Sequence, residues 1–89
     1  MATIKVFIKL QEGGIAESLN NAAGKLPAEQ PVLDFSSIRR INPSALRALE
    51  ELASAGDGQA VRIDIRGIDV SVYKVLKVAN LAQRFSFVN

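Results

Sequence analysis

Apolar and polar residues alternate in two stretches of the chain, and this pattern predicts two strands with one buried face. The first stretch covers residues 3–11, whose apolar positions are Ile4, Val6, Ile8 and Leu10. The second covers residues 60–66, whose apolar positions are Val61, Ile63 and Ile65. A two-residue period with β-branched side chains is typical of a half-buried strand. Residues 32–35 and 85–88 alternate less, and they predict a central strand and a closing strand or docked apolar tail.

Three other stretches repeat apolar residues at helical spacing. The first covers residues 15–26. The second follows Asn42, a favoured N-cap residue, and should end at Gly56, because glycine suits the residue just past a helix. The third covers residues 70–80, with Asp69 as its cap. The predicted inward positions of this third helix are Val72, Val75, Leu76 and Ala79.

The order of these elements is strand–helix–strand–helix–strand–helix–strand, which predicts one α/β domain over residues 1–89 with right-handed crossovers. Strands covered on both faces would be apolar throughout. Because two of the four strands alternate instead, the helices should lie largely on one face of the sheet. We therefore expect a two-layer sandwich of about four mainly parallel strands and about three helices.

The composition of the chain excludes several classes of function. The 89 residues include neither histidine nor cysteine, which removes most metal sites and most nucleophile–base pairs. We expect no enzyme activity, no metal and no cofactor. The net charge of +2 is too small to indicate nucleic acid. No apolar run reaches the length of a membrane span and the amino terminus does not resemble a signal peptide, so a cytoplasmic protein is expected.

The loop between the predicted strand 32–35 and the helix after Asn42 lies at the carboxyl edge of the sheet, where α/β folds usually bind ligands. Asp34 is the carboxylate at this edge. It could be a structural acceptor that ties the loop to backbone donors of the next helix, or it could order a binding or modified serine nearby. Arg39 and Arg40 in the loop are more often a solvated pair than a phosphate site.

The segment from Val32 to Leu52 has three consecutive parts. The strand is residues 32–35, the link is Ile38-Arg39-Arg40-Ile41 and the helix opening is Asn42-Pro43-Ser44-Ala45-Leu46. This segment resembles the core of a STAS domain, the fold of the anti-sigma factor antagonists, in which an apolar strand ends in aspartate, an apolar–x–x–apolar link follows, and an Asp-Ser-Ser-Gly-Leu type of sequence opens a helix. Residues 61–68 and 72–81 resemble the family's later strand, glycine turn and final helix.

One departure from the family pattern affects the regulation that the resemblance implies. In the antagonists a partner kinase phosphorylates the first hydroxyl residue after the signature aspartate. That position is Pro43 here, Asn42 replaces the aspartate, and proline has no hydroxyl to modify. Ser44 is one residue further, where the helix amino terminus would favour a phosphate by roughly 0.3–1 kcal/mol. The favoured interpretation is that Asn42, Pro43 and Ser44 only begin the helix, and phosphorylation of Ser44 is the minor expectation.

The resemblance implies that the loop and the start of the following helix dock a protein partner such as an anti-sigma factor or kinase-like protein. Asp34 and Pro43 would be structural at this edge. The residues expected to bind the partner are Ser36, Ser37, Arg39, Arg40, Asn42, Ser44 and Arg47. The chain would then be a non-catalytic bacterial regulatory module without the usual serine switch.

Two alternatives come from the same family. The size and the closing helix with Val72-Tyr73 are most similar to the small STAS subunit of the bacterial phospholipid transporter that maintains outer-membrane asymmetry. Such a subunit would brace an ABC-transporter ATPase. A weaker alternative is a nucleotide-binding STAS domain. Separately, Phe7 on the open sheet face and an exposed edge at residues 85–88 predict a weak homodimer.

Overall fold

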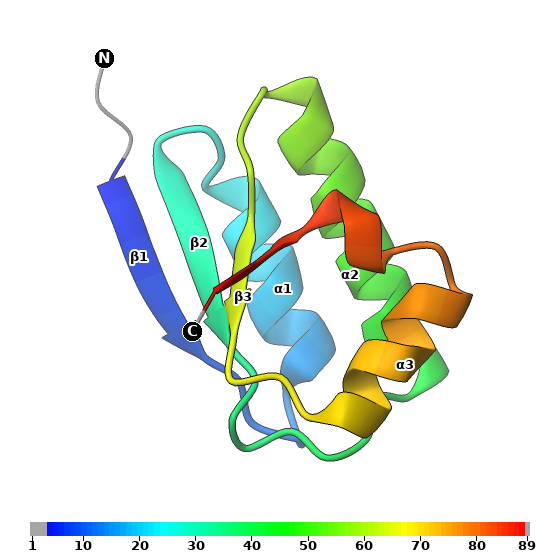
Figure 1. Cartoon of the computed structure of the whole chain (residues 1–89). Coiled ribbons are helices and arrows are strands. Elements are labelled where there is room, and N and C mark those ends of the chain that lie inside the picture. The colour runs from blue at the N-terminus through cyan, green and yellow to red at the C-terminus, as the bar shows by residue number, and fades with distance from the viewer. Residues whose placement is uncertain (1–3, 89) are drawn as a thin grey trace.

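The computed structural model describes residues 4–88 as an alternation of strands and helices (Figure 1). The elements are β1 (Ile4–Lys9), α1 (Ile15–Gly24), β2 (Glu29–Asp34), α2 (Pro43–Gly58), β3 (Asp64–Arg66), α3 (Val70–Val78), η1 (Ala82–Arg84) and β4 (Ser86–Val88). All four predicted strands and all three predicted helices are present.

The four strands form one parallel sheet in the order β1-β2-β3-β4. Each strand therefore pairs with the next in the chain, and each crossover contains one α-helix. Right-handed crossovers that all step in the same direction place their helices on the same face of the sheet. In Figure 1, α1 and α2 lie behind the sheet and α3 lies beside it, with no helix in front of the strands, which confirms the predicted two-layer sandwich with one open face.

The hydrophobic core lies between the sheet and the helices. Ile8, Leu33, Ile65 and Phe87 are in register across the four strands and form one row of its sheet side. The helices contribute the largest buried side chains on the other side of the core, namely Leu19, Leu49, Leu52, Val72 and Leu76. Burying a side chain of this size contributes about 1.5–3 kcal/mol, so this layer dominates the stability of so short a chain.

Helix α2 starts as the sequence predicts but ends later. Asn42 caps the helix by accepting a hydrogen bond from the backbone N–H of Ala45 at 2.7 Å. The predicted end at Gly56 is wrong, because the helix continues through Gly58. Gly56 is buried inside the helix, where an added Cβ would approach the carbonyl oxygen of Val61 and Cδ1 of Ile63 to 2.7 Å. The glycine therefore allows close packing and does not stop the helix.

The end of α2 also explains why β3 is shorter than the predicted strand 60–66. Ala60 takes the left-handed conformation with φ of 57°. Its neighbour Val61 donates its N–H back to the carbonyl of Gly56 at 2.8 Å. This pairing is the Schellman motif that closes many helices. The side-chain amide of Gln30 donates a hydrogen bond to the carbonyl of Arg62 at 2.7 Å. These backbone groups are thus used outside the strand ladder, and regular pairing begins at Asp64.

Helix α3 is shorter than the predicted 70–80 and differs from the prediction at one inward position. Asp69 caps it as expected by accepting from the N–H of Ser71 at 3.0 Å. Val72 and Leu76 are buried, whereas Val75 is 40% exposed, so its predicted inward orientation is wrong. The nine-residue helix crosses the domain with only a narrow buried stripe, and Val75 lies beside that stripe. The result is an apolar outer side on α3.

Candidate functional site

The candidate site is built where β2 and β3 end beside each other. The backbone N–H of Phe35 donates to the carbonyl of Arg66 at 2.9 Å, which extends the pairing of the two strands to their carboxyl ends. Gly67 then turns the chain with φ of +67°. An added Cβ there would lie 3.2 Å from Cβ of Ser36 and 3.3 Å from Oδ1 of Asp34. The two exit loops are therefore in direct contact.

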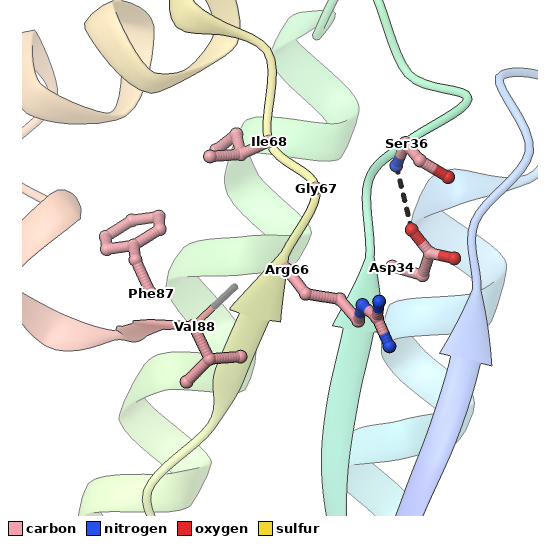
Figure 2. A pocket seen from close by; sticks show the side chains of 7 residues that line it. All are labelled: Asp34, Ser36, Arg66, Gly67, Ile68, Phe87 and Val88. Atoms are coloured by element: carbon pink, nitrogen blue, oxygen red, sulfur yellow. Dashed lines mark hydrogen bonds between the residues drawn. The ribbon is translucent and has the colours of Figure 1, made fainter.

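A pocket of about 370 Å³, here called the strand-end pocket, opens at this edge of the sheet. It has a polar side and an apolar side (Figure 2). The lining residues are Asp34, Ser36, Arg66, Gly67, Ile68, Phe87 and Val88. The guanidinium of Arg66 extends toward Asp34 in Figure 2, while Phe87, Val88 and Ile68 form the opposite wall. The chemistry available is one carboxylate, one guanidinium, one hydroxyl and an apolar surface.

Asp34 orders the loop that follows it. Its Oδ1 accepts a hydrogen bond from the backbone N–H of Ser36 at 2.9 Å. Hydrogen bonding by Ser36 lowers the pKa of Asp34 below its ordinary value, and the positive charges of Arg66 and Lys9 act in the same direction. The expectation that Asp34 ties the loop to donors of the next helix is wrong, because Asn42 takes that role at α2.

The loop between β2 and α2 is held by one buried side chain and presents its polar residues to solvent. Ile38 is 1% exposed, and its N–H donates to the carbonyl of Phe35 at 2.9 Å. The loop residues Ser36, Ser37, Arg39 and Arg40 are all exposed. This arrangement fixes the course of the loop without covering its outer surface. The loop is therefore accessible to a partner.

Arg39 differs from Arg40 because it is partly engaged within the domain. Its Nη1 lies 3.4 Å from Oδ1 of Asp69, which caps α3. Hydrogen bonding by Ser71 lowers the pKa of Asp69, and the charge of Arg39 adds to this effect. The ion pair is exposed to solvent. Such pairs usually contribute about 0–1 kcal/mol to stability, so Arg39 can leave Asp69 at little cost.

The start of α2 forms a second surface beside α1. Asn42, Ser44 and Arg47 are exposed there, as is Pro43 at the first position of the helix. A groove of about 260 Å³ runs between the two helices. Its lining residues are Ala16, Asn20, Pro43, Ser44, Arg47, Ala48 and Glu51.

The predicted site residues follow one another along the loop and the start of α2, but they do not share one hollow. Ser36 and Asp34 belong to the strand-end pocket, whereas Pro43, Ser44 and Arg47 belong to the groove against α1. Sequence reasoning missed Arg66 as a neighbour of Asp34. The signal was available, since both residues end strands that the alternation and order place side by side, and Asp34 is in register with Arg66.

The described residues 4–88 contain no group of three or more aspartate, glutamate, histidine or cysteine side chains that could hold a metal ion. Helices in the same part of the chain are all too short or too polar to cross a membrane.

Comparison with known proteins finds no family model that matches the chain and no curated protein that matches it. The resemblance to STAS domains therefore depends on the residues quoted above and on the order of the elements.

Proposed function

We propose that the chain is a non-catalytic regulatory module of the STAS type that binds a protein partner through the loop 36–42 and the start of α2. The observation that carries the proposal is that this edge combines a fixed backbone with exposed polar and basic side chains. Ile38 anchors the loop, Asn42 caps the helix, and Arg40 and Arg47 extend from the two segments into solvent. Arginine is enriched in protein interfaces, where its fork of donors makes specific contacts.

The same edge would act without the serine switch of the antagonists. Pro43 stands at the first position of α2 and offers no hydroxyl, while Ser44 is exposed one residue later. A phosphate on Ser44 would meet the helix amino terminus and Arg47, one turn further along the same helix. We therefore propose constitutive partner binding in the cytoplasm, with modification of Ser44 as the minor route of control.

The test is a charge reversal at the proposed surface. The double variant Arg40→Glu/Arg47→Glu should lose the partners recovered by the native chain in a pull-down. The double variant Lys74→Glu/Lys77→Glu is the matched control, because it makes the same change in net charge on exposed positions of α3. Equal recovery of partners by the native chain and by the Arg40→Glu/Arg47→Glu variant would refute this surface.

A second candidate is a subunit that braces the ATPase of an ABC transporter, and one observation favours it. An apolar groove of about 350 Å³ lies between α2 and α3, lined by Leu46, Lys74, Val75, Val78 and Ala79. Val78 is 85% exposed although it is aliphatic. An exposed apolar surface across two helices suits a stable protein contact. Under this candidate the α3 variant, and not the Arg40→Glu/Arg47→Glu variant, should lose its partner.

Nucleotide binding is the weaker proposal, supported only by the position of the strand-end pocket at the carboxyl edge of a parallel sheet. Titration with GTP and ATP should then raise the midpoint of thermal unfolding. Arg66→Gln would be expected to remove that shift, because Arg66 supplies the guanidinium of the pocket. A midpoint that stays constant at high nucleotide concentration would exclude this proposal.

A further inference from the structure

Strand β1 leaves one edge of the sheet free within residues 4–88, since it pairs only with β2. Ile4 and Leu10 direct their N–H groups to carbonyls on the β2 side. Alternate residues of a strand direct their N–H and C=O groups to opposite edges. Lys5, Phe7 and Lys9 therefore direct their backbone groups outward, where another chain could pair with them.

The side chains of these three outward residues share the open face of the sheet. Phe7 is 65% exposed, and the guanidinium of Arg66 lies 5.8 Å from the centre of its ring. Lys5 Nζ lies 3.5 Å from Oδ2 of Asp64, on the same face. Lys9 is in register with Asp34, the acceptor for Ser36. The edge thus presents a row in which an aromatic ring lies between two cations.

Lysines on an edge strand often serve only to prevent pairing with other chains. That role does not account for the apolar side chains exposed on the same strand. Besides Phe7, Ile4 is 67% exposed, on the opposite face of β1. A further strand beside β1 would cover part of both side chains, and it would satisfy the outward backbone groups at the same time.

We propose that the β1 edge accepts an extended acidic peptide segment with the pattern acid–x–apolar–x–acid. In an antiparallel pairing, residues with outward backbone groups lie directly opposite partner residues whose side chains share their face. An acidic residue would then oppose each of Lys5 and Lys9, and an apolar residue would oppose Phe7. The open face supports this charge preference, because it carries Lys5, Lys9, Arg62 and Arg66 against Asp34 and Asp64.

A second copy of the chain fits this edge poorly. In an antiparallel pairing centred on Phe7, Lys5 of one copy would lie opposite Lys9 of the other, and this contact would occur twice. Like charges directly opposite each other on paired strands are destabilising. The edge therefore favours an acidic partner over self-pairing. This inference does not depend on the proposed function, which concerns the loop and the start of α2.

The test measures fluorescence anisotropy of a labelled peptide, Thr-Glu-Val-Leu-Val-Glu-Thr, titrated with the full chain. A peptide with both glutamates replaced by lysine is the charge control. A peptide with N-methylated backbone amides is the control for strand pairing. The Glu peptide should bind, and each control peptide should bind at least about tenfold more weakly, a difference that corresponds to the loss of a few directional contacts.

Variants of the chain locate the binding. Lys9→Glu should weaken binding of the Glu peptide and improve binding of the Lys peptide. Lys5→Glu/Lys9→Glu should enlarge both effects, and a urea titration checks that the loss of the contact with Asp64 leaves the double variant folded. Lys74→Glu/Lys77→Glu makes the same charge change on α3 and should leave the affinity unchanged. Arg40→Glu/Arg47→Glu should also leave it unchanged, which separates this inference from the proposed function.

Three results would overturn the inference. The first is that the Glu peptide does not bind, in which case the two lysines only protect the edge. The second is equal binding of the N-methylated peptide, which would mean attraction by charge without strand addition. The third is displacement of the Glu peptide by a single-stranded oligonucleotide of equal charge at the same concentration, which would show an anion surface without peptide specificity.

Discussion

Replacement of Gly67 with alanine should loosen the contact between the loops that follow β2 and β3. Gly67 has φ of +67°, and an added Cβ would lie 3.2 Å from Cβ of Ser36. It would also lie 3.3 Å from both atoms of the hydrogen bond between Asp34 Oδ1 and the N–H of Ser36. The alanine therefore strains its own backbone and crowds the turn that shapes the strand-end pocket.

The magnitude follows from three contributions. An L side chain in the left-handed region costs roughly 1–2 kcal/mol. Weakening of the Ser36–Asp34 hydrogen bond adds about 0.5–1.5 kcal/mol. The alanine also restricts the unfolded chain, which offsets about 0.4–1 kcal/mol. We expect Gly67→Ala to lower the free energy of unfolding by about 0.5–3 kcal/mol.

Urea denaturation measures this change, provided that the slope m stays constant between variants. Gly24→Ala is the matched control, because nothing lies within 4 Å of its added Cβ, and it should be neutral or slightly stabilising. Gly67→Asn separates the two causes, since asparagine tolerates positive φ but keeps the Cβ. It should fall between the native chain and Gly67→Ala. A Gly67→Ala variant as stable as the native chain would refute this account of the contact.

Three further changes test other contacts. Gly56→Ala should destabilise the fold by about 1–3 kcal/mol, because the added Cβ would crowd the carbonyl oxygen of Val61. The same change in an exposed helix is favourable, so a gain in stability on urea denaturation would contradict the packing described for this glycine. Ala60→Gly should stabilise by roughly 1 kcal/mol, because it relieves the left-handed alanine that follows α2, and a lower denaturation midpoint would count against this. Folding lowers the pKa of Asp34 below its ordinary value of 3.8, so the ionised carboxylate stabilises the fold above pH 3.8. This contribution is lost as the pH falls from 3.8 through the lower pKa of the folded state. Asp34→Asn should show a smaller loss of stability below pH 3.8 in acid titrations followed by circular dichroism, and an unchanged acid profile would contradict the assignment.

The architecture could be predicted from the sequence because its signals are local and repeat along the chain. Alternation in residues 3–11 and 60–66 indicated a sheet with one open face, and the sheet is covered by helices on one side only. Asn42 and Asp69 were recognisable as caps because a cap requires only a suitable side chain next to the helix it closes.

The errors arose where a residue's role depends on contacts distant in sequence. Gly56 was expected to end a helix, but it is buried inside α2 because Ile63 packs against it. Helical spacing placed Val75 inward, whereas the covered stripe of α3 reaches only Val72 and Leu76. The same limit applies to the site, since Asp34 and Arg66 are 32 positions apart and become neighbours only through strand register.

Site-specific photo-crosslinking tests the central claim, that the loop entering α2 contacts another macromolecule, most directly. A photoreactive residue would replace Ser37, an exposed residue of the loop, in one variant and Gln59, the exposed residue at the other end of α2, in a second. After irradiation in the cells that produce the protein, the Ser37 position should give a single covalent protein adduct and the Gln59 position should give none. Adducts of the same protein from Gln59 alone, or in equal yield from both positions, would contradict the claim.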